Sequence, residues 1–149
     1  MWENLIVKLK SILEANNEIA VVFDYEEGEF DSQPAAVIVP SDSEAEYSTS
    51  LDNSRVYAFS VFLFVQRNDK NVPYDDKKAD AIMRDLVDSV VDDFDKNWNL
   101  SGLTLKTGYQ MLMMEAAPSQ WGYANRENLY RMSEIIVRVH LNVDTNLIS

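Results

Sequence analysis

The chain has 149 residues and no cysteine, a length that makes one domain able to bury its own core. Its 25 acidic and 13 basic residues give a formal net charge of −12, which argues against a binder of duplex DNA or anionic membranes, because both need basic patches. Disulfides and thiolate-held zinc or iron–sulfur sites are excluded. With no signal-peptide core at the start and no run of 18 apolar residues, we expect a soluble protein made and used in a cytoplasm.

Two helices are predicted by apolar residues that recur every three or four positions. The first spans Trp2 to Leu13, with its charged residues off the apolar face. The second spans Asp75 to Asn97 and has an apolar stripe opposite a row of aspartates. Its stripe consists of Ala79, Ile82, Met83, Leu86, Val87, Val90, Val91 and Phe94. Each helix therefore has one face suited to packing on a sheet.

Six strands are predicted from β-forming residues and alternating polarity. They cover residues 19–23, 35–39, 55–67, 103–107, 109–117 and 129–144. The third strand gives the strongest signal, and both it and the last are longer than most strands of a small domain. The segments 41–53 and 118–125 are predicted to be loops because they are rich in polar and turn-forming residues.

This order of elements predicts a single α+β domain over residues 1–149. We expect a two-layer sandwich, in which two helices cover one face of a mainly antiparallel sheet and a long acidic loop connects two strands. The core should be the seam between the layers. Residues expected to be largely buried there are Leu9, Phe59, Val61, Leu86, Val90, Val137 and Val139.

Charge is concentrated between Asp24 and Ser54, where nine acids occur without any Lys or Arg. Either this stretch is a pair of solvated loops, or it is a surface that repels nucleic acid or meets a basic partner. Within it, Ser41 to Asn53 is expected to be mobile in the free subunit, because few apolar side chains offset about 1–2 kcal/mol of ordering per residue.

Several acidic and aromatic residues in these polar segments are candidates for an interface or for the lining of a lumen. Aromatic residues are enriched at protein interfaces, although packing of the loops on their own domain is the alternative. The candidates are Asp42, Glu44, Glu46, Tyr47, Asp52, Trp121 and Tyr123.

The sequence has few of the residue patterns that are typical of catalytic sites. The four glycines are too scattered for a phosphate-binding loop, and His140 is the only histidine, so a two-histidine metal site is impossible. We interpret His140 as a surface residue beside Arg138 and Asn142 on the polar face of the last strand. We therefore expect no enzymatic activity, no cofactor and no metal.

The order of elements resembles that of a known family. A short amphipathic helix, two strands and an acidic loop precede the strand Tyr57–Val65, the helix Ala79–Val91, the turn Asn99–Gly102 and the closing strand Ile135–Leu141. This pattern resembles the tail terminator (tail completion) proteins of tailed bacteriophages and their relatives in the tail-to-head joining group. The resemblance covers nearly the whole chain and rests on pattern, without a catalytic motif.

The resemblance implies a structural virion protein of the tail or neck, assembled in the host cytoplasm. Six copies would form a ring that caps the tail tube, ends its polymerisation and joins the tail to the head connector protein. DNA would pass through the ring without specific binding, which suits an acidic wall. Three alternatives stay open: a related injection-machine or head-completion component, a monomeric acidic binding or inhibitor module of the DNA-mimic type, and a ligand-binding or enzymatic domain.

Overall fold

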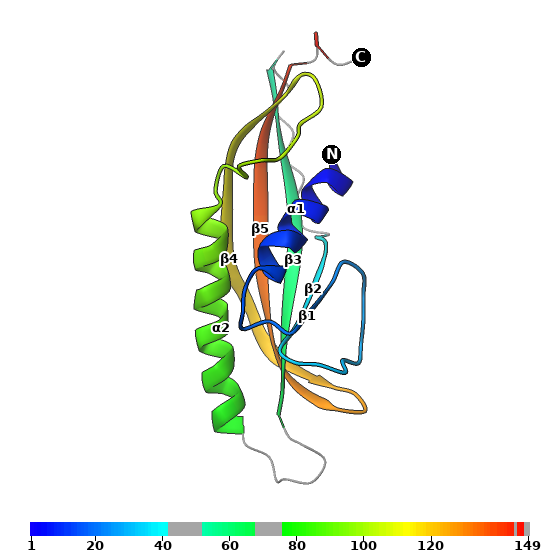
Figure 1. Cartoon of the computed structure of the whole chain (residues 1–149), viewed down its shortest axis with the longest axis vertical. Coiled ribbons are helices and arrows are strands. Elements are labelled where there is room, and N and C mark those ends of the chain that lie inside the picture. The colour runs from blue at the N-terminus through cyan, green and yellow to red at the C-terminus, as the bar shows by residue number, and fades with distance from the viewer. Residues whose placement is uncertain (42–51, 68–75, 145, 148–149) are drawn as a thin grey trace.

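The computed structural model describes residues 1–41, 52–67, 76–144 and 146–147. Two helices and five strands occur in this part of the chain, and both helices lie on one face of a single sheet (Figure 1). In chain order the elements are α1 (Trp2–Glu14), β1 (Val21–Phe23), β2 (Ala35–Pro40), β3 (Asp52–Gln66), α2 (Asp76–Lys96), β4 (Tyr109–Asn125) and β5 (Leu129–Asp144). The predicted α+β sandwich of two layers is confirmed.

The sheet has the strand order β1-β2-β3-β5-β4. β3 and β5 pair in antiparallel fashion over the whole of β3, from Asp52 opposite Asp144 to Gln66 opposite Tyr130. Fifteen residues in β3 correspond to about 50 Å at ~3.3 Å per residue. This central pair gives the molecule its elongated shape (Figure 1).

The main core fills the seam between the helices and the sheet. Alternate residues of β3 and β5 point toward α1 and α2, and the predicted core residues are confirmed as buried. Their exposed fractions are 0% or 1% for Leu9, Phe59, Val61, Leu86, Val90, Val137 and Val139. Ile82 departs from the predicted stripe of α2, because 39% of it is exposed.

A second, smaller core lies on the opposite face of the sheet, which we call the open face. β1 and β2 are parallel neighbours, so the chain between them must cross a face of the sheet to return, and the helices occupy the other one. Phe30 in this crossing packs on Phe64 and Tyr130, with ring centroids 4.9 and 5.5 Å away. The crossing segment is thereby fixed to the open face.

Two predicted segments after α2 were wrong. Residues 103–107 form no strand; instead Leu103 and Leu105 pack on the core from a loop. Residues 118–125, predicted as a loop, continue β4 to Asn125. Pro118 and Gly122 predicted a break in the strand there. An edge strand tolerates a proline, however, because backbone N–H groups on its outer side need no partner in the sheet. The register shift between Pro118 and Gln120 absorbs the irregularity.

Candidate functional site

β4 forms one edge of the sheet and has no strand on its outer side within the described residues. Four large apolar side chains on it are between 42% and 54% exposed: Leu112, Met113, Trp121 and Tyr123. Exposed edge strands tend to pair with other chains unless something interrupts them. Here Pro118 and the register shift that follows it interrupt the middle of the strand, and a second shift lies between Met111 and Met113 near its start. The exposed apolar side chains therefore lie on either side of Pro118, with Leu112 and Met113 at the second shift and Trp121 and Tyr123 near the end of the strand.

The predicted interface residues Trp121 and Tyr123 lie on β4, on the face that carries the helices. Their partners across the ladder are Ser133 and Arg131 of β5. The guanidinium carbon of Arg131 lies 5.6 Å from the ring centre of Trp121 and 4.7 Å from that of Tyr123. Arg67 lies 4.4 Å from the same Tyr123 ring centre. All three distances are within the range of a cation–π interaction, which extends to about 6 Å.

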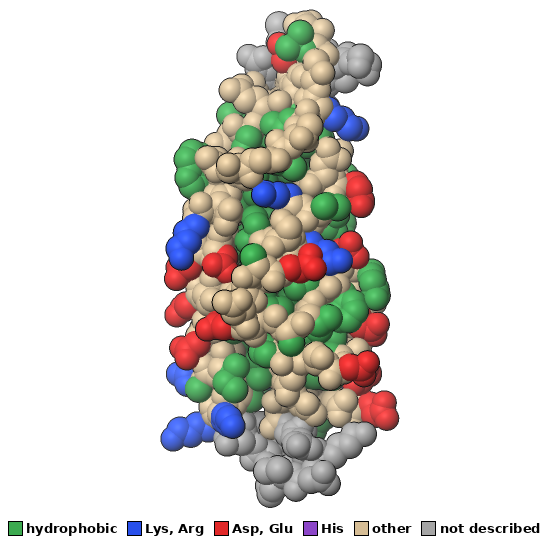
Figure 2. All heavy atoms as spheres, viewed as in Figure 1, with side chains coloured by type: hydrophobic (Ala, Val, Ile, Leu, Met, Phe, Trp, Pro, Cys, Tyr) green, Lys and Arg blue, Asp and Glu red, His purple; other side chains and the backbone are tan. Residues whose placement is uncertain are grey.

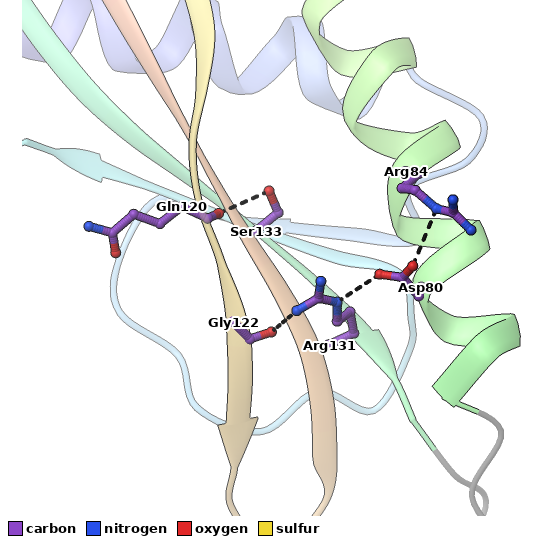
Figure 3. A network of polar contacts seen from close by, with 6 residues as sticks. All are labelled: Asp80, Arg84, Gln120, Gly122, Arg131 and Ser133. Atoms are coloured by element: carbon purple, nitrogen blue, oxygen red, sulfur yellow. Dashed lines mark hydrogen bonds and ion pairs between the residues drawn. The ribbon is translucent and has the colours of Figure 1, made fainter.

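Arg131 also joins this end of the sheet to the beginning of α2 (Figure 3). Its Nε lies 3.1 Å from Oδ1 of Asp80, and its Nη1 donates a hydrogen bond of 2.9 Å to the carbonyl oxygen of Gly122. Oδ2 of Asp80 lies 3.3 Å from Nε of Arg84. The side chain of Arg84 is 64% exposed and that of Arg131 only 14%, so Arg131 is the fixed member and Arg84 faces solvent.

We call this group the arginine–aromatic surface. It consists of Arg67, Asp80, Arg84, Trp121, Tyr123 and Arg131. The sequence prediction included its two aromatic residues but not its arginines or Asp80. One signal was present: Arg131 shares the apolar face of the last strand with Ile135 and Val137, and a charged residue on an apolar strand face indicates a specific partner.

The segment Asp24–Asp31, which we call the acidic segment, crosses the open face. Oε2 of Glu29 accepts hydrogen bonds from Nδ2 of Asn128 at 3.0 Å and from the hydroxyl of Tyr130 at 3.2 Å. Burial opposes ionisation of Glu29, but the hydrogen bonds from Asn128 and Tyr130 outweigh it and lower the pKa of this carboxyl. Burial, in turn, raises the pKa of Tyr130. Glu29 therefore anchors the segment, whereas Tyr25, Glu26 and Asp31 are exposed.

The other predicted interface or lumen residues are less informative. Asp42, Glu44, Glu46 and Tyr47 lie outside the described residues, as does most of the segment that was predicted to be mobile. Asp52 begins β3, where it is opposite Asp144. The two aromatic residues of β4 are therefore the predicted positions that the structure brings into a cluster.

The open face also contains the only histidine. His140 Nε2 lies 3.1 Å from Oε1 of Glu115. A hollow of about 520 Å³ on the same face has walls that include Glu26, Glu134 and Arg138. Across the ranges that the structure describes, no group of three or more acidic or histidine residues is placed to hold a metal ion. The contact is partly exposed, since 27% of the His140 side chain and 50% of the Glu115 side chain are accessible to solvent.

Comparison with models of protein families finds no match, and comparison with curated protein sequences finds none either. Neither helix of the described chain is long and apolar enough to cross a membrane.

Proposed function

We propose that this protein is a ring-forming structural subunit of a bacteriophage tail, of the tail terminator type. The ring would cap the tail tube, end its polymerisation and present its other face to the head connector protein. The observation that carries the proposal is the edge strand β4, whose Trp121 and Tyr123 are exposed beside arginines. Trp, Tyr and Arg are the residues that most often dominate the binding energy of protein interfaces.

The fold is compatible with this role. A closed ring needs two different surfaces on each subunit, one for each neighbour. The two edges of this sheet differ in that way, since β1 has three residues and β4 has seventeen. The order of two helices and a mainly antiparallel sheet is also what the resemblance to tail terminators implies.

The charge of the chain suits a channel for DNA. With a formal net charge of −12 per subunit, the wall of a ring would repel the phosphate backbone, and DNA would slide through without specific binding. In this proposal the protein needs no cofactor and catalyses no reaction. Its partners are further copies of itself, the tube protein and the connector.

The proposal is tested by native mass spectrometry of the protein and by electron microscopy after purified tube protein is added. We expect rings of six subunits, either free or at tube ends, and shorter tubes when the protein is present during polymerisation. A protein that stays monomeric in every buffer and leaves tube length unchanged would contradict the proposal.

A second function is favoured by the acidic segment, because Glu26 and Asp31 are exposed. A monomeric binding or inhibitor module of the DNA-mimic type would present such carboxylates to a basic partner. This alternative predicts a stable monomer that binds a DNA-binding protein in competition with DNA, and the same mass measurement separates it from the ring.

A further inference from the structure

We infer that the acidic segment of one copy docks on the arginine–aromatic surface of the next copy. This inference rests on the proposed function, because it names the contact by which the ring would close. It assigns Tyr25, Glu26 and Asp31 to one side of the contact, and Arg84, Trp121 and Tyr123 to the other.

Within one chain these two surfaces cannot meet. The acidic segment is held on the open face, where Phe30 packs on Tyr130 and Glu29 bonds to Asn128. Arg131 lies next to Tyr130 in β5 and points to the other face, where it pairs with Asp80 of α2. The sheet therefore separates the two surfaces, and a contact between them requires a second copy.

The composition of the two surfaces is complementary. On one side, Trp121 and Tyr123 are 43% and 54% exposed, and Arg84 carries a largely exposed guanidinium. On the other side, Tyr25 is 55% exposed between acidic neighbours. Such a pairing brings aromatic rings together at the centre and opposite charges at the rim, as in other specific interfaces.

The distribution of charge also favours docking of the acidic segment near the beginning of α2. Figure 2 shows Lys and Arg side chains gathered where α2 begins, and Asp and Glu side chains along both margins of this view. Further along α2, the exposed residues Asp85, Asp88, Asp92 and Asp95 would repel an acidic segment. Electrostatics therefore directs the segment to the first turns of the helix and to the neighbouring end of β4.

A contact between two different surfaces is head-to-tail, so repeated copies close into a ring when the rotation between neighbours permits. Direct pairing of two β4 edges would instead give a two-fold dimer. The two geometries place different residues next to each other, and disulfide trapping can distinguish them because the chain has no native cysteine.

The experiment mixes Glu26→Cys protein with Tyr123→Cys protein under mild oxidation, and detects disulfide-linked dimers by denaturing electrophoresis and mass spectrometry. We expect the mixed dimer to be the main product. Neither variant alone should form much disulfide-linked dimer. Lys106→Cys, an exposed position on the turn before β4, mixed with Glu26→Cys is the control and should give little product. A double variant carrying Glu26→Cys and Tyr123→Cys should give a ladder of larger species.

Charge reversal gives an independent readout by sedimentation. Lys77 is an exposed residue in the first turn of α2, two turns before Arg84. Lys77→Glu with Arg84→Glu should weaken association by about tenfold or more, as should Glu26→Lys with Asp31→Lys. The combination of both pairs should restore association. Lys96→Glu with Lys106→Glu changes the net charge equally, in the last turn of α2 and in the connection before β4, and should have a smaller effect.

Dominant Tyr123→Cys homodimers, or no response to charge reversal at either surface, would overturn the inference. If rings still cap tubes in that case, the proposed function stands and a different contact closes the ring. If the protein neither associates nor caps tubes, both the inference and the proposed function fail.

Discussion

Asp80 and Arg131 form an ion pair across the two layers of the molecule, with Oδ1 and Nε 3.1 Å apart. Asp80 comes from the beginning of α2 and Arg131 from β5, which are 51 residues apart in the chain. The pair holds the Arg131 guanidinium near Trp121 and Tyr123. One carboxylate therefore links α2 to the guanidinium that lies near both aromatic rings.

Replacing Asp80 by Asn should lower the free energy of unfolding by about 0.5–1 kcal/mol, because a partly exposed ion pair contributes no more than that. The larger effect should be local, as Arg131 loses its partner and the fluorescence of the nearby Trp121 changes. Urea unfolding and tryptophan emission measure the two effects. Asp88→Asn, on the outward face of the same helix, is the control and should change neither.

Leu86 is buried between α2 and the sheet, with 1% of its surface exposed. Leu86→Ala should lower the free energy of unfolding by about 2–5 kcal/mol, because a cavity forms in a packed core. Ile82→Ala, four residues earlier on the same helix and 39% exposed, should cost much less. Equilibrium unfolding in urea tests both, and a cost below about 0.5 kcal/mol for Leu86→Ala would contradict the assigned core.

Glu29 should make stability depend on pH. Its pKa in the folded protein is lowered from an ordinary value of 4.5, so its contribution is fully present above that value and is lost as the pH falls through the folded pKa. Glu29→Gln should therefore be less stable than the parent at pH 7, and the difference should shrink in acid. Urea unfolding of both proteins at pH 7 and at about pH 3 measures this. An equal difference at the two pH values would show that ionisation of Glu29 is not the cause.

Assembly should respond to salt. Six copies would carry a formal charge of 6 × −12, or −72, and this repulsion is screened over a Debye length of roughly 30 Å at 0.01 M salt and 8 Å at 0.15 M. Rings should therefore be more populated at the higher salt concentration. Light scattering across salt and protein concentration measures the change, and dissociation on adding salt would mean that the complementary charges dominate over net repulsion.

Local sequence patterns are sufficient to predict the two layers of this protein. Apolar side chains at helical spacing define the buried faces of α1 and α2, and alternation defines both faces of β3 and β5, because these periodicities follow from local backbone geometry. The core predicted from them, including Leu9, Phe59 and Val137, is buried. The aromatic residues Trp121 and Tyr123 were likewise recognised as exposed candidates from their polar surroundings.

The extent of β4 and the arginine–aromatic surface depend instead on contacts between distant parts of the chain. Residues 118–125 contain turn formers, and they are extended because β5 offers a full ladder of hydrogen-bond partners, which no local pattern reveals. The same pairing places Tyr123 opposite Arg131, and helix packing then brings Asp80 to that arginine. These contacts join residues far apart in the chain, so they depend on strand order and on which face each segment covers. Local propensity specifies neither.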